Sequence, residues 1–374
     1  MPRASVLLVP LLTTLLVGTS CRKEVEKLVV QQVDKQYSWT AVSSPYFTGN
    51  GQIILGLSQD AASLYLQQPG RLGRLTPRPS GRQAYVSASL PPLPTDVRLR
   101  IPLTPDFFVF ANFRQDSVLE VRPTQDPVTQ GYTDVIRLRQ LDPLAVSFEP
   151  NYFDFWRFGA VSRNNYLLLG YNTSLSYNDS YLRFVLAKVT APPTQPVRVQ
   201  ARTLKIPRPV GIGYGYIRWI AAVDDYFLVN CGQAGLFKVS EAGAVKQVYG
   251  ATLSDACYQW HGTLYLVEEY NSLLRSFDGG DTWQRYSTPA NVFDFTTYHP
   301  VGDSLVVATH GIGTTSLFTL RWDNLTYKLR PLKTDGLNGG TISGLAQLGD
   351  TVYLSTTSGL YRRPLSKFFE STKP

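Results

Sequence analysis

Short apolar runs separated by tight polar turns recur through the second half of the chain. These runs occupy residues 225–229, 262–267, 303–307 and 350–354. Each is followed by a polar turn and another apolar stretch, at 235–239, 272–277, 316–320 and 359–363. Such runs predict β-strands, and the spacing between repeats is about 40 residues, the length of a four-stranded unit. The pattern therefore predicts an all-β protein built from repeated antiparallel units.

The first half carries the same kind of run at 53–55, 107–110 and 166–169. Longer intervals there indicate insertions, such as the segment rich in Pro, Arg and Gly at 69–81. In 374 residues, 22 Tyr, 18 Phe and 6 Trp supply strand formers, while 29 Gly and 25 Pro supply turns. These repeats predict a single β-propeller with seven four-stranded blades. Six or eight blades remain open, because the insertions can be placed differently.

The two ends of the repeated region suggest how the ring closes. The last unit, 341–365, has room for three strands, whereas 37–45 reads like an outer strand without a blade. The spacing from Trp39 to Pro45 equals that from Trp283 to Pro289. We expect the N-terminal strand to complete the last blade and remove exposed sheet edges. The propeller would then span 37–366, followed by a C-terminal tail at 367–374.

The N-terminus resembles a bacterial lipoprotein signal. Arg3 precedes an apolar run at 6–17, and Gly-Thr-Ser leads into Cys21. The resemblance implies a signal peptide at 1–20, lipidation of Cys21 and a charged tether at 21–36. An ordinary secretory signal cut nearby is the alternative. The apolar run is too short to span a membrane.

The tether begins with Arg-Lys-Glu-Val-Glu, which resembles the export tags of surface lipoproteins in some Gram-negative bacteria. The expected location is the cell envelope of such a bacterium, as an outer-membrane lipoprotein that faces the periplasm or the surface. Membrane contact would come through the lipid anchor only. The formal net charge of +8 is scattered along the chain, so we expect no nucleic-acid partner.

Cysteines and histidines set limits on the chemistry. Cys231 and Cys257 would share one face of the ring, so an exported chain could join them in a disulfide; two buried thiols are the alternative. His261, His299 and His310 show no metal-ligand spacing. We expect a monomer without metal or cofactor.

The segment Ser276-Phe277-Asp278-Gly279-Gly280-Asp281-Thr282-Trp283 matches the Asp-box pattern S-x-D-x-G-x-T-W at every specified position. Asp278 can accept hydrogen bonds from the amides of its own turn, Gly280 permits backbone angles that a Cβ forbids, and Trp283 begins the outgoing strand. Its structural residues are Ser276, Asp278, Gly280, Thr282 and Trp283. The chain thus resembles the Asp-box (BNR-type) repeat propellers. In that family the turn joins the two outer strands of a blade, away from the central mouth.

Three arginines lie on predicted inner strands of successive blades. Arg100 falls in 98–103, Arg157 in 156–161 and Arg218 in 217–223. If the three side chains converge on the central channel, their guanidinium groups would suit a carboxylate or phosphate. The alternative is that they are solvated or paired channel residues.

Arg100-Ile101-Pro102, followed by the apolar stretch at 107–114, resembles the opening hairpin of sialidases, propellers with three carboxylate-binding arginines. That resemblance implies a sialidase-like glycoside hydrolase. The chain departs from the family in carrying one Asp box and in placing the motif in the second predicted blade. No catalytic residue can be assigned, so we expect a non-catalytic binding or scaffold protein, with the hydrolase as the alternative.

Polar residues at the predicted mouth are further candidates for ligand contact. Glu268, Glu269 and Tyr270 offer two carboxylates and a phenol, and His310 follows a second strand of the same kind. Other mouth candidates are Asn230, Thr309, Thr356 and Thr357. The expected ligand is an anionic glycan or an envelope protein.

Overall fold

The structure is a computed structural model. It describes residues 38–43, 47, 52–77, 83–89, 103–112, 115–124, 133–147, 159–175, 179–192, 195–208, 217–252, 254–268, 272–287, 295–311, 314–323 and 326–371. The chain divides into two units, Met1–Gln36 and Tyr37–Pro374. The first unit, with Cys21, lies outside the described residues.

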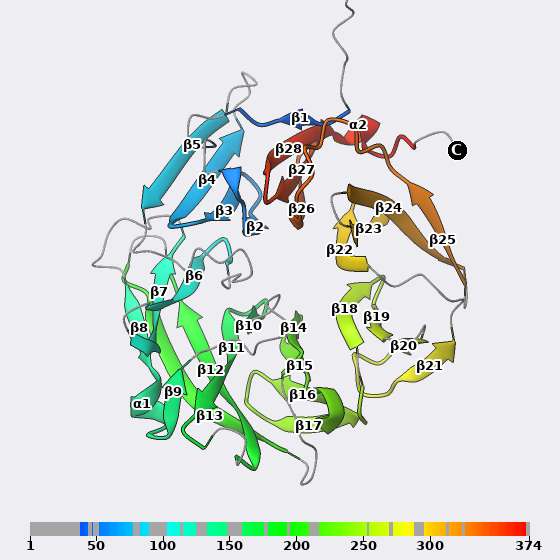
Figure 1. Cartoon of the computed structure of the whole chain (residues 1–374). Helices are drawn as coiled ribbons and strands as arrows, with labels where there is room; N and C mark the ends of the chain where they lie inside the picture. Colours follow the sequence, from blue (N-terminus) through cyan, green and yellow to red (C-terminus); the bar gives the residue numbers. More distant parts are fainter. Residues whose placement is uncertain are drawn as a thin grey trace, which may run out of the picture. The chain divides into compact units, whose positions relative to one another are not determined.

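The second unit is a seven-bladed β-propeller, as the repeats predict (Figure 1). Blades are numbered here in chain order. Blade 1 contains β2 (Gly56–Gln59), β3 (Leu64–Gln68), β4 (Arg71–Pro77) and β5 (Gln83–Ser89). Blade 2 contains β6 (Phe107–Asn112), β7 (Gln115–Pro123) and β8 (Asp134–Arg137). Blade 3 contains β10 (Gly159–Val161), β11 (Tyr166–Thr173), β12 (Tyr181–Thr190) and β13 (Arg198–Pro207), joined by β9 (Ala145–Ser147).

Blades 4 to 7 are the four repeats that the second half of the sequence predicts most clearly. Blade 4 contains β14 (Trp219–Val223), β15 (Tyr226–Asn230), β16 (Leu236–Ser240) and β17 (Val245–Tyr249). Blade 5 contains β18 (Ser254–Trp260), β19 (Thr263–Glu268), β20 (Ser272–Ser276) and β21 (Gln284–Ser287). Blade 6 contains β22 (Phe295–Val301), β23 (Ser304–Gly311), β24 (Thr314–Asp323) and β25 (Thr326–Pro331). Blade 7 contains β26 (Ile342–Leu348), β27 (Thr351–Thr356), β28 (Gly359–Pro364) and β1 (Thr40–Ala41).

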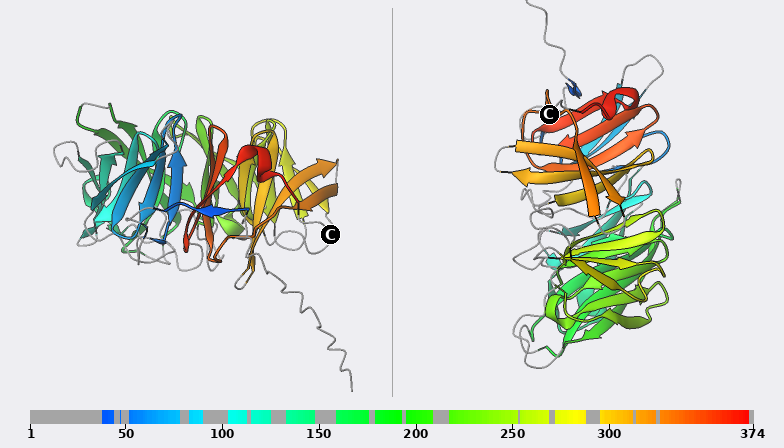
Figure 2. Two further views of the ribbon diagram at one scale, coloured as in Figure 1. Left: turned by 90° about the horizontal axis from the view of Figure 1, so that it is seen from above. Right: turned by 90° about the vertical axis from the view of Figure 1, so that its right-hand side faces the viewer.

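Neighbouring blades meet through their inner strands. Contacts join β10 to β14, β14 to β18, β18 to β22, β22 to β26 and β26 to β2, and Figure 2 shows the blades from two further directions. In blade 2 the predicted inner strand, 98–103, is described only at Leu103, which forms a β-bridge with Phe108. The inner strands therefore follow the chain order around the ring.

Closure by the N-terminal strand is confirmed. Thr40 pairs with Arg362 and Ala41 with Tyr361, so β1 is the outer strand of the last blade. Trp39 is buried, and its indole Nε1 donates to the carbonyl oxygen of Lys333 at 3.0 Å. Because one blade combines the two ends of the domain, unravelling either end breaks the ring.

The residues after β28 also pack on blade 7. Helix α2 (Leu365–Phe368) buries Phe368, whose ring meets the Trp39 ring edge-on with centroids 5.9 Å apart. Glu370 accepts a hydrogen bond from Lys333 at 3.0 Å and one from the buried Arg363 at 3.2 Å. Part of the segment predicted as a tail therefore covers the closing strand.

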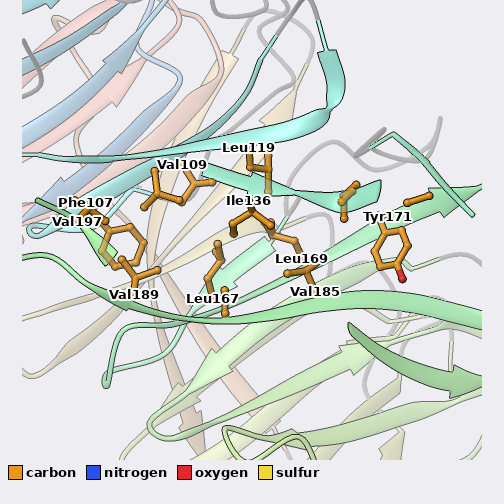
Figure 3. Close-up of a cluster of buried hydrophobic side chains, with 14 residues drawn as sticks. Phe107, Val109, Leu119, Ile136, Leu167, Leu169, Tyr171, Val185, Val189 and Val197 are labelled. Carbon is orange, nitrogen blue, oxygen red and sulfur yellow. The ribbon is translucent and has the colours of Figure 1, made fainter. Parts of the chain in front are cut away.

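Apolar layers between adjacent blades form the core. The layer between blades 2 and 3 includes Phe107, Val109, Leu167, Leu169 and Val185, shown in Figure 3. The alternation of buried side chains along the strands puts every second residue into such a layer. Each blade is therefore apolar on both faces.

One predicted strand is wrong. Residues 53–55 do not form a strand but lead into β2, the inner strand of blade 1. The amide of Ile54 donates to the carbonyl of Thr356 in blade 7, and that of Leu55 to Gln67. The run is apolar because both side chains are buried in the ring, not because it repeats the second-strand pattern.

The Asp-box segment forms the expected turn between β20 and β21. Asp278 accepts hydrogen bonds from the amides of Asp281 and Thr282, each at 3.0 Å, and from the Thr282 hydroxyl at 2.6 Å. These bonds hold the pKa of the Asp278 carboxyl well below its usual range. The Ser276 hydroxyl accepts from the amide of Gly280, and the Trp283 indole donates to the Gly280 carbonyl. The turn thus satisfies its own polar groups and joins the two outer strands of blade 5.

Replacing Gly280 with alanine should lower the free energy of unfolding by about 1–2 kcal/mol, because Gly280 has a φ of +86°. An added Cβ would also lie 3.4 Å from Leu228 of blade 4. Gly250→Ala is the matched control: its Cβ would meet nothing within 4 Å, and we expect a change below about 0.5 kcal/mol. Urea unfolding curves measure both. Equal midpoints for the two variants would contradict the structural role of the turn.

Candidate functional site

The predicted arginine cluster is described at one position. Arg218 lies just before β14, is half-buried, and donates its amide to the carbonyl of Asn230 at 2.8 Å. Arg100 and Arg157 lie outside the described residues. Convergence of the three guanidinium groups therefore stays a prediction.

Glu268 ends β19 and is buried inside blade 5. One carboxylate oxygen accepts from Thr252 at 2.7 Å, and the other accepts from Ser272. Arg285 of β21 lies 3.0 Å from the same carboxylate. These contacts join the second, third and fourth strands of the blade to the segment that precedes its inner strand, so Glu268 has a structural role at this end of the blade.

The structure describes the side chains of some of the other predicted mouth residues and not of others. Asn230 and Thr356 are buried and bonded within the protein: Asn230 donates to Ser254 of blade 5, and Thr356 shares a hydrogen bond with Ser358. His310 lies in β23 opposite Thr315, while its side chain lies outside the described residues.

Glu269 and Tyr270 also lie outside the part of the chain that the structure describes, as does the side chain of Thr309. Thr357 accepts a hydrogen bond from the amide of Thr341 at 3.0 Å. Ligand contact by these residues stays a prediction.

Cys231 and Cys257 are both buried free cysteines. Cys231 packs in the apolar layer between blades 3 and 4, and Cys257 packs in the layer between blades 4 and 5. Blade 4 therefore separates the two thiols, although both lie near strand ends. Burial raises the pKa of the Cys231 thiol. The sequence alternative of two buried thiols is the one that the structure shows.

A buried charge cluster that the sequence did not reveal lies in blade 3. Arg183 donates to Asp142 from Nη1 and to Asp179 from Nε, both at 2.6 Å. Tyr171 donates to Asp142 at 2.7 Å, and Thr173 donates to Asp179 at 2.9 Å. All five side chains are buried. The cluster joins β11 and β12 to Asp142, the C-cap residue of helix α1 (Leu138–Leu141).

Burial opposes ionisation of the two carboxyl groups, but their hydrogen bonds outweigh it. The pKa of Asp142 is lowered by Tyr171, Leu144 and Arg183, and that of Asp179 by Arg183, Thr173 and Tyr181. The hydrogen bond to Asp179 raises the pKa of Arg183 further above its usual value. All three groups are therefore charged at neutral pH, and they fix helix α1 and β9 to the sheet of blade 3.

Four exposed apolar side chains lie on the segments that adjoin this cluster. Leu144 is 39% exposed, Val146 43%, Leu175 40% and Tyr181 42%. The amide of Ser174 donates to the carbonyl of Leu144, and β9 pairs with the end of β11, so the segments that carry Leu144, Val146 and Leu175 lie side by side. The amide of Leu144 donates to Asp142 and that of Tyr181 to Asp179, which brings both residues to the same cluster. We call Leu144, Val146, Leu175 and Tyr181 the blade 3 shoulder.

Large apolar side chains with such exposure are few in the described part of the chain. The two others are Val135, in β8 of blade 2, and Phe277, in the turn of blade 5. Exposed apolar residues that gather in one place mark interaction surfaces, whereas isolated ones need no explanation. The shoulder is therefore the strongest candidate for a binding surface among the described residues.

One sequence signal could have pointed to the shoulder. In the run Leu144-Ala145-Val146-Ser147, the apolar residues occupy both faces of a short strand that follows Asp142-Pro143. Ala145 and Ser147 are buried, and Val146 is exposed. A surface strand ordinarily carries polar residues on its outer face. The partner segments, Leu175 and Tyr181, have no local signal, because only the fold brings them to β9.

Neither a metal centre nor a membrane-spanning helix occurs within the described ranges. No group of three or more His, Cys, Asp or Glu side chains is arranged there to hold a metal ion. The helices described there are too short or too polar to cross a membrane.

Comparisons with known proteins show the fold alone. No protein-family model and no curated protein matches the sequence. Virginiamycin B lyase from Staphylococcus aureus superimposes with a TM-score of 0.52 at 12% identity, covering 87% of this chain and 98% of that one. YCF48 bound to D1 peptide gives a TM-score of 0.48 at 12% identity, with 88% and 97% covered. BamB from Moraxella catarrhalis gives 0.43 at 11% identity, with 83% and 85% covered.

Proposed function

We propose that this protein is a non-catalytic binding protein of the cell envelope, anchored through lipidated Cys21, and that the blade 3 shoulder is its binding surface for a protein partner. The observation that carries the proposal is that four large apolar side chains, each about two-fifths exposed, lie on segments that adjoin one buried charge cluster. The cluster holds the surface in place, so little ordering is needed when a partner binds.

A protein partner fits this surface better than a glycan. Leucine and valine side chains offer no hydrogen bonds to sugar hydroxyls, whereas they gain from burial against apolar side chains. An anionic glycan would instead need the channel arginines, of which only Arg218 is described. A sialidase-like hydrolase would need catalytic groups there too, and Glu268 is bonded within its own blade.

Site-specific photo-crosslinking in intact cells of the source organism tests the proposal. A photoreactive amino acid replaces Tyr181 in one variant and Phe277, which is 62% exposed in blade 5, in the control. We expect one discrete protein adduct from position 181 and none from position 277. The adduct should disappear when Leu144→Asp is added. No adduct at 181, or the same adducts at both positions, would refute the proposed function.

A further inference from the structure

We propose that the blade 3 shoulder recognises an acidic amphipathic segment of its partner, a peptide whose apolar side chains cover the shoulder while its carboxylates meet the surrounding basic residues. This inference rests on the proposed function and adds the chemistry of the partner. It follows from the charges around the shoulder, from the contacts of Tyr181 and from the exposure of the apolar side chains.

The charged surface around the shoulder is basic. The exposed or half-buried basic residues near it are Arg137 at the end of β8, Arg139 on α1, Lys205 near the end of β13, the outer strand of blade 3, and Arg208 just after it. Two of them lie next to the shoulder itself. The Lys205 ammonium lies 5.7 Å from the centre of the Tyr181 ring, and the amide of Arg208 donates to the carbonyl of Ser180.

Within the described residues, the acidic side chains near these basic residues are all bonded to other groups of the protein. Asp134 accepts from the amides of Val135 and Val199, at 2.8 and 2.7 Å. Asp142 and Asp179 are buried against Arg183. The exposed side chains therefore present mainly positive charge, and a complementary partner carries negative charge.

The apolar residues show that charge is only part of the recognition. Lys205 lies close to the Tyr181 ring, so the cation and the apolar surface are presented together. A segment with carboxylates beside apolar side chains matches this arrangement, whereas a purely acidic chain would leave Leu144, Val146 and Leu175 uncovered. Each side chain that becomes covered adds to the binding free energy in proportion to the apolar area removed from water.

The same features favour a peptide over an anionic lipid surface. Membrane binding by a folded surface needs apolar groups that reach about 5–10 Å into the headgroup boundary. The four shoulder side chains are each more than half covered by their own protein; Val146 lies in β9, Tyr181 begins β12, and Leu144 and Leu175 lie in the turns beside β9 and β11. They lie close to the surface rather than projecting from it, which suits contact with another protein.

Two synthetic peptides of equal length and identical apolar residues test the proposal, one with glutamate and one with lysine at the charged positions. Fluorescence anisotropy measures their binding to the folded propeller. We expect the glutamate peptide to bind at least about tenfold more tightly at low salt, with the difference shrinking as salt screens the charges. Val146→Ser should weaken the binding of both peptides, because it removes apolar area without changing charge.

Reversing charge at exposed positions gives the matched comparison. Arg137→Glu with Arg139→Glu should reduce or invert the preference for the glutamate peptide. Lys328→Glu with Arg330→Glu on β25 of blade 6, also exposed, should leave it unchanged. Equal binding of the two peptides, or the same response to both double variants, would overturn the inference. Phosphatidylglycerol vesicles that bind more strongly than the glutamate peptide, and lose binding in Val146→Ser, would overturn it in favour of a membrane.

The cellular crosslink separates this inference from the proposed function. A crosslink at position 181 that persists unchanged in Arg137→Glu with Arg139→Glu would overturn the acidic partner and leave the binding function standing. A crosslink that is lost with these reversals and kept with those of blade 6 would support both. Absence of the crosslink together with equal peptide binding would refute both.

Discussion

Replacing Arg183 with methionine should lower the free energy of unfolding by about 3–5 kcal/mol. The change leaves Asp142 and Asp179 buried without their shared cation, and an uncompensated buried charge is strongly destabilising. Arg202→Met on the neighbouring strand, where the side chain is exposed, is the control and should change stability by less than about 0.5 kcal/mol. Urea unfolding at pH 7 measures both.

If the unpaired carboxylates cause this loss of stability, neutralising them should restore part of it. Adding Asp142→Asn and Asp179→Asn to Arg183→Met removes the uncompensated charges, so the triple variant should be more stable than Arg183→Met alone. In the wild type, the pKa values of both carboxyl groups are lowered on folding, so their contribution is full above about pH 4 and is lost as the pH falls further. If the triple variant is no more stable than the single one, packing and not charge governs this site.

Replacing Trp39 with alanine should lower the free energy of unfolding by about 3–5 kcal/mol, as removal of a buried tryptophan does. Trp39 is 1% exposed, bonds to the carbonyl of Lys333 and packs on Phe368, so it holds both ends of the domain on blade 7. Thermal unfolding followed by circular dichroism measures the loss. Phe277→Ala, at an exposed aromatic position, is the control and should leave the melting temperature nearly unchanged.

Truncation separates closure from simple cavity formation. Deleting residues 37–45 removes β1 as well as Trp39, and it should cost more stability than deleting 22–36, which lies outside the propeller. The loss of stability on deleting 37–45 should also exceed that of Trp39→Ala, because the outer edge of β28 loses its pairing strand. Equal melting temperatures for the two truncations would contradict closure by the N-terminal strand.

The binding surface depends on a local departure from the regular blade. In blade 3, β11 pairs with β10 through residues 167–169 and with β9 at residues 172 and 173, so two separate segments of the chain cover the same edge in turn. This places β9, with Val146, and the adjoining Leu144 at the end of the sheet, where the amide of Leu144 donates to Asp142 of the Arg183 cluster. An ordinary four-stranded blade would not bring these residues to β11.

Features that depend on local sequence patterns could be predicted from the sequence. Alternating apolar residues predict the strands of blades 4 to 7, because each strand buries both faces against its neighbours. The turn at 276–283 is predictable because Asp278 bonds to groups within four residues of itself. Closure was also predictable, because a three-stranded last unit and an unpaired first strand complement each other.

Other features depend on which residues the ring brings together. Cys231 and Cys257 are both near strand ends, yet blade 4 separates them, because the direction in which a side chain points depends on register and not on sequence spacing. The run at 53–55 is apolar because it packs against blade 7, which lies about 300 residues away in sequence.

The all-β repeat, the turn of blade 5 and the closing role of the N-terminal strand could each be predicted from the residues alone. These follow from side-chain periodicity and from hydrogen bonds within one turn or between complementary ends. The positions of the buried charge cluster and of the exposed apolar side chains depend on how the strands pair in the folded ring. Asp142, Asp179 and Arg183 form one cluster, and Leu144 and Tyr181 lie beside it, because pairing of β9, β11 and β12 overcomes their separation along the chain.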